Sequence, residues 1–123
     1  MMGSIKYDLA VVFRHAPHGS AKGREGLDLL LLAASYDQQC AALFVGDGVF
    51  QLRKDQQPAA IESKDYIATF KALPLYDVET VLVCETALAE RGMSVEDLIL
   101  PVTLVTADAV TAHLNQSQQV LTF

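Results

Sequence analysis

The chain has 123 residues, of which 51% are hydrophobic, and a formal net charge of −6 at pH 7. Its nine basic residues are dispersed, which argues against direct binding to a nucleic-acid backbone. The longest apolar stretch, residues 29–34, is too short to cross a bilayer, and the first residues do not have the pattern of a signal peptide. We therefore expect one domain over residues 1–123, cytoplasmic and without membrane contact.

Apolar runs alternate with helical stripes along the chain. We expect strands at residues 7–13, 40–45, 81–84, 102–105 and 120–123. We expect helices at residues 27–37, 66–73, 87–91 and 107–114. This alternation predicts a three-layer α/β fold of flavodoxin-like type, with a mainly parallel sheet of about five strands and helices on both faces.

Local signals refine this outline. Gly46, Asp47 and Gly48 predict a turn after the second strand, followed by a polar, mobile connection over residues 51–60. Pro74 is expected to stop the second helix. Thr106 is a candidate N-cap, and a cationic His113 would suit the C-terminal end of the last helix.

A glycine-containing loop, APHGSAKGREGLD at residues 16–28, joins the first strand to the first helix. In open α/β proteins, ligands and partners bind at such junctions. The candidate binding residues are His18, Gly19, Arg24, Glu25 and Gly26. The string is not a nucleotide-binding fingerprint, and the spacing of the glycines favours a simpler role, in which they start the helix and pack it on the sheet.

The two cysteines are predicted to be free thiols, since the chain has no CxxC pair. Cys40 opens an apolar run and is interpreted as core. Cys84 ends the third strand just before a helix, where exposed N–H groups favour a thiolate that can attack persulfides. Simple burial of Cys84 remains an alternative. We predict no metal site and no cofactor, because no spacing typical of zinc ligands or phosphate-binding loops is present.

Four strings occur together and in order: APHGSAKGREGLD, DGVFQL, DYIATFKALPLYDVE and VCETALAERGM. They resemble the DsrE/DsrF-like family, and within it the C-type subunit of the sulfur-relay complex for tRNA 2-thiouridine synthesis. The resemblance covers nearly the whole chain. It implies a heterohexamer with two copies each of B-, C- and D-type subunits, which passes persulfide sulfur from an upstream carrier protein to a downstream one.

The resemblance also bears on single residues. The family's sulfur-carrying cysteine is assigned to the D-type subunit, at a position that Cys84 matches here. The resemblance to the C-type subunit implies a structural or accessory role in the complex, and therefore a non-catalytic one. Two alternatives stay open: a persulfide sulfurtransferase that uses Cys84 directly, and a small-ligand-binding module that uses the loop after the first strand.

Overall fold

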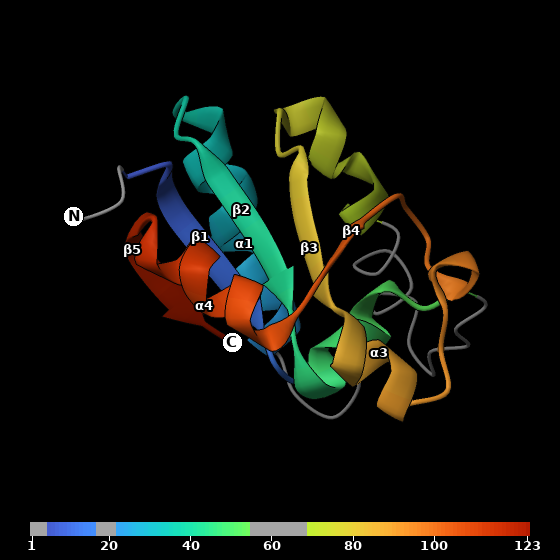
Figure 1. Cartoon of the computed structure of the whole chain (residues 1–123). Helices are drawn as coiled ribbons and strands as arrows, with labels where there is room; N and C mark the ends of the chain where they lie inside the picture. The colour runs from blue at the N-terminus through green and yellow to red at the C-terminus, as the bar shows by residue number, and fades with distance from the viewer. Residues whose placement is uncertain (1–4, 17–21, 55–68) are drawn as a thin grey trace.

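The computed structural model describes residues 5–16, 22–54 and 69–123 (Figure 1). Within these residues the strands form one sheet: β1 (Tyr7–Phe13), β2 (Cys40–Phe44), β3 (Thr80–Cys84), β4 (Thr103–Val105) and β5 (Ser117–Thr122). Their order is β4-β3-β2-β1-β5, and every neighbouring pair is parallel. The predicted parallel sheet is therefore confirmed, with β5 returning to lie beside β1.

Helices cover both faces of this sheet. The α-helices are α1 (Lys22–Ser35), α3 (Glu85–Glu90) and α4 (Ala107–Asn115). Three 3₁₀ segments accompany them: η1 (Gly46–Leu52), η2 (Phe70–Tyr76) and η3 (Val95–Asp97). One apolar core includes residues of α1, η1 and η2, and a second, smaller one includes residues of α4. This is the expected three-layer, flavodoxin-like arrangement.

The larger core is built around three phenylalanine rings from separate elements. Phe13 ends β1, Phe44 ends β2 and Phe70 begins η2. The Phe13 and Phe44 rings stack at 4.8 Å, and Phe70 meets them edge-on at 5.4 and 5.7 Å. Offset and edge-to-face contacts are the favoured geometries of buried aromatic rings. They hold η2 against the carboxyl ends of β1 and β2.

The prediction that Pro74 stops its helix is wrong, because Pro74 lies inside η2. Its carbonyl accepts a hydrogen bond from the Asp77 N–H at 3.1 Å, so the segment continues to Tyr76. It ends at Asp77, whose φ of 64° is left-handed. Tyr66 and Ile67, the first part of the predicted helical stripe, lie outside the described residues.

Candidate functional site

Cys84 lies at the carboxyl edge of the sheet, as the last residue of β3 and the N-cap of α3. Its backbone is extended, with φ −66° and ψ 116°, so the chain turns directly from strand into helix. The Cys84 residue is only 9% exposed. The expected position is thus confirmed, and the thiol is a free one that is largely covered by its neighbours.

An ion pair joins α3 to η1 at the same edge. The Arg91 guanidinium donates from Nε to Asp47 Oδ1 at 3.0 Å, and a second guanidinium nitrogen lies 3.0 Å from the same oxygen. Another nitrogen of Arg91 donates to the Ala87 carbonyl at 2.9 Å. The sequence alone did not predict this pair, because its partners lie 44 residues apart in two separate strings, DGVFQL and VCETALAERGM.

The segment after β2 differs from the prediction of a turn and a polar, mobile connection. Residues 46–52 form η1, and Gln51 and Leu52 are fully buried. The Gln51 amide donates to the His15 carbonyl at 2.9 Å, which satisfies a polar group where β1 leaves the sheet. The expectation of polar mobility is therefore wrong for these two residues. Residues 55–60 of that stretch lie outside the described residues.

The candidate loop residues are separated by the structure. His18 and Gly19 lie outside the described residues. Arg24 and Glu25 are exposed on the first turns of α1. Gly26 is buried, and a Cβ placed there would lie 2.8 Å from the Phe13 ring and 2.9 Å from Phe123. Gly26 thus brings α1 close to the sheet, and a ligand site in this loop stays a prediction.

Cys40 lies at the opposite, amino edge of the sheet, where it begins β2. It is buried, as the core interpretation predicts. Burial first, and the nearby Asp8 carboxylate second, raise the pKa of this thiol. Cys40 therefore stays in the thiol form and is a poor nucleophile. Since the two cysteines lie at opposite edges, the prediction of free thiols is confirmed.

His113 is not the cationic helix cap that the sequence suggested. Its Nδ1 forms a hydrogen bond with the Tyr7 hydroxyl at 3.1 Å, and Lys6 lies over the Tyr7 ring at 5.6 Å. Burial first, and the positive charge of Lys6 second, lower the pKa of His113. The last turn of α4 therefore carries a histidine that resists protonation. The predicted N-cap at the other end is confirmed, because the Thr106 side chain accepts from the Ala109 N–H.

This histidine predicts a pH dependence of stability. Its folded-state pKa lies below the ordinary value of 6.5, so the unfolded chain binds the proton more readily. The stabilising effect of neutral His113 is complete above about pH 6.5 and is lost as the pH falls toward the folded-state pKa. We expect Tm to fall between about pH 7.5 and about pH 5.5, and to fall less in His113→Gln. An equal fall in both proteins would contradict this assignment.

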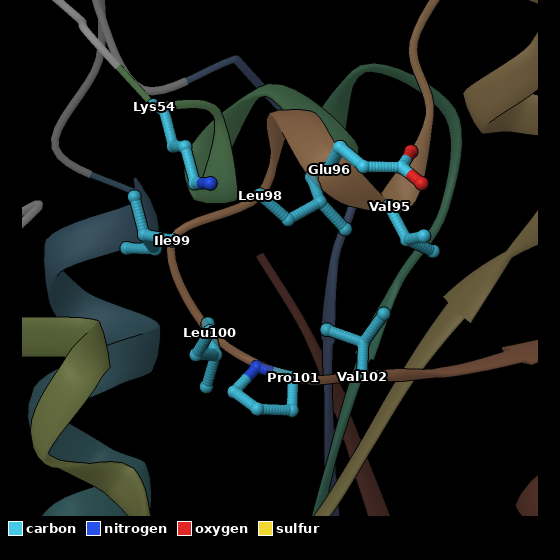
Figure 2. Close-up of a pocket in the computed structure, with 8 residues that line it drawn as sticks. All are labelled: Lys54, Val95, Glu96, Leu98, Ile99, Leu100, Pro101 and Val102. Carbon is cyan, nitrogen blue, oxygen red and sulfur yellow. The ribbon is translucent and has the colours of Figure 1, made fainter.

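A groove of about 480 Å³ is lined by η3, by the connection from η3 to β4 and by Lys54 (Figure 2). Its lining is mainly aliphatic and consists of Lys54, Val95, Glu96, Leu98, Ile99, Leu100, Pro101 and Val102. A second hollow adjoins it and shares Lys54 and Glu96, with Arg91 on its wall. Cys84 lines neither of them. The two hollows therefore do not form a substrate pocket around the thiol.

In the three ranges that the structure describes, no group of three or more His, Cys, Asp or Glu side chains is arranged to hold a metal ion. The search of the same ranges for a helix both long and apolar enough to cross a membrane found none.

The architecture defines the class of protein: a five-stranded parallel α/β domain with a free cysteine where a central strand meets a helix. The DsrE/DsrF-like family model matches residues 8–123, so the chain belongs to that family. A solved structure described as the ychN protein from E. coli has the same fold, with a TM-score of 0.79. That comparison covers 96% of this chain and all of the other at 22% identity.

Two relatives are more similar to the chain than this solved structure is. The chain is 44% identical over 115 residues to a protein named TusC homolog from Aliivibrio fischeri. It is equally similar, over 116 residues, to a protein named TusC from Klebsiella pneumoniae. Each comparison covers 94% of this chain and 98% of the relative. The similarity therefore extends over almost the full length of both proteins.

Proposed function

We propose that the chain is a subunit of a sulfur-relay complex that passes persulfide sulfur between carrier proteins for 2-thiolation of the wobble uridine of tRNA. The observation that carries this proposal is the 44% identity to proteins named TusC over nearly their whole length. The partners would be B-type and D-type subunits, two copies of each in a heterohexamer, together with upstream and downstream sulfur carriers. The setting would be the cytoplasm, where such thiols stay reduced.

We assign the chain a structural or accessory role within that complex. A sulfur carrier must bring its thiolate to a persulfide on another protein, which requires access. Cys84 is 9% exposed, and Cys40 is buried with a raised pKa. The net charge of −6 also opposes direct binding to tRNA phosphates. These observations support a role in assembly more than one in the transfer itself.

Direct transfer through Cys84 is the second candidate, and its position favours it. Cys84 precedes the first turn of α3, whose free N–H groups attract negative charge. In this mechanism the Cys84 thiolate attacks the outer sulfur of a donor persulfide. A new S–S bond forms, the donor's own sulfur leaves as a thiolate, and Cys84 holds the persulfide.

Assembly is tested by co-expression with B- and D-type subunits. We expect the three chains to co-purify as one species whose native mass corresponds to two copies of each. The control is an unrelated acidic α/β domain of similar size, expressed in the same way. Recovery of this chain alone, with the B- and D-type subunits assembled without it, would overturn the proposal.

The accessory role is tested by intact mass after incubation with a cysteine desulfurase and cysteine, with a D-type subunit in the same tube. We expect the D-type subunit to gain about 32 Da, one sulfur atom, and this chain to gain none. Cys84→Ser and Cys40→Ser are measured alongside. A gain on this chain that Cys84→Ser removes and Cys40→Ser keeps would establish Cys84 as a carrier instead.

A further inference from the structure

Two turns of the same make-up precede the neighbouring strands β2 and β3. Tyr36 and Asp37 follow α1. Tyr76 is the last residue of η2, and Asp77 follows it. Both aspartates are left-handed, with φ of 63° and 64°. Because β2 and β3 pair in parallel, with Ala41 opposite Thr80, the two turns meet at the amino edge of the sheet. Figure 1 shows both turns at the upper end of the sheet, away from α3.

Large apolar side chains are exposed around these turns. Tyr36 is 74% exposed, Leu75 85%, Leu32 55% and Tyr76 44%. On α1 the buried residues include Gly26, Leu27 and Leu30, and Leu32 lies on the opposite side of the helix. We name Leu32, Tyr36, Leu75 and Tyr76, with Asp37 and Asp77, the amino-edge patch. Leu32 belongs to α1, Tyr36 directly follows it, and Leu75 and Tyr76 belong to η2, which packs against α1.

Such a surface is unfavourable unless a partner covers it. Clustered exposed apolar groups mark interaction sites more often than single ones do, and tyrosine is enriched in protein interfaces. Each turn also has an aspartate at its left-handed position, a residue type that tolerates this backbone, and so has a carboxylate directly after a tyrosine.

The charges around the patch favour a basic partner over a second copy of the chain. Asp37, Asp77 and Glu79 are exposed there, and Lys71 is the exposed cation of η2. A twofold contact between copies would bring these carboxylates together, which is repulsive. An arginine would suit the surface, because its guanidinium stacks on tyrosine and pairs with aspartate.

We propose that the amino-edge patch is the docking surface for another subunit of the relay complex, one that presents an apolar centre rimmed by Arg or Lys. This inference rests on the proposed function, since the partner is a B- or D-type subunit. Docking there leaves Cys84 and the carboxyl edge of the sheet uncovered by that partner.

The test is calorimetric titration of the full chain into co-expressed B- and D-type subunits. We expect the double variant Tyr36→Glu with Leu75→Glu to weaken binding by at least about 100-fold. Asp37→Asn with Asp77→Asn keeps residues that tolerate the left-handed backbone and removes only charge. We expect it to weaken binding by about 10-fold and to reduce the salt dependence. Val95→Glu, at a residue 44% exposed on η3, is the matched control and should bind normally.

Circular dichroism and Tm are measured first, to show that each variant folds. If wild type does not bind the B- and D-type subunits, the proposed function fails and this inference with it. If wild type and both double variants bind equally, only the inference fails. If the chain alone sediments as a dimer that Tyr36→Glu with Leu75→Glu dissociates, while binding to the subunits persists, a second copy occupies the patch and the inference is wrong.

Discussion

Gly48→Ala is expected to lower the free energy of unfolding by at least about 3 kcal/mol, because η1 rests directly on the end of β1. A Cβ at Gly48 would lie 1.8 Å from the Phe13 carbonyl oxygen and 2.5 Å from its carbon. The Phe13 atoms belong to the backbone, and the backbone of residue 48 fixes the position of its Cβ. No change of rotamer therefore relieves the contact. The Phe13 oxygen is also held in place, since it accepts the Val45 N–H at 3.1 Å.

Urea unfolding of Gly48→Ala beside Gly92→Ala measures this cost. Gly92 has a φ of 67° but no atom within 4 Å of the added Cβ. Gly92→Ala should therefore cost only about 1–2 kcal/mol, the strain of a left-handed alanine. A loss at Gly48 no larger than the loss at Gly92 would show that η1 moves away from β1 without much resistance.

The same substitution bears on the candidate site. Asp47 and Gln51 both belong to η1, and they hold Arg91 of the α3 region and the His15 carbonyl after β1. Displacing η1 would loosen the carboxyl edge around Cys84 from two sides. Gly48, the glycine of the DGVFQL string, is therefore required by the packing of η1 on β1, whichever role Cys84 has.

Most of the fold was predictable because the central strands are buried on both faces. β1, β2 and β3 read as short apolar runs, and their observed bounds lie within one residue of those expected. β5 begins at Ser117, three residues earlier than predicted. The prediction missed these residues because they are polar and do not extend the apolar run. Its pairing with β1 as an edge strand does not require apolar residues on both faces.

The site was less predictable because its contacts join distant parts of the chain. Gln51 looks solvent-exposed in a polar stretch, and its burial depends on the His15 carbonyl 36 residues away. The position of His113 near the end of a helix predicted a cationic cap. Its actual partner, Tyr7, lies 106 residues away in the sequence and could not be predicted from it. Cys84 was placed correctly because a strand followed at once by a helix is a local signal.

Phe70→Ala is expected to cost about 3–5 kcal/mol, the range for a fully buried phenylalanine. Phe70 is 0% exposed and contacts the rings of both Phe13 and Phe44. Its removal would leave a cavity between η2 and the two central strands. Because the rings come from three elements, the cavity cannot close without moving η2 or the end of a strand.

Leu75→Ala provides the comparison, since Leu75 belongs to the same segment but is 85% exposed. We expect it to change stability by no more than about 0.5 kcal/mol. Differential scanning calorimetry of the isolated chain measures both variants. If the two substitutions cost the same, η2 does not divide into a buried half that supports the fold and an exposed half. If Phe70→Ala alone is destabilised, Leu75 is left without a role in the stability of the isolated chain, which fits its place in a surface that a partner covers.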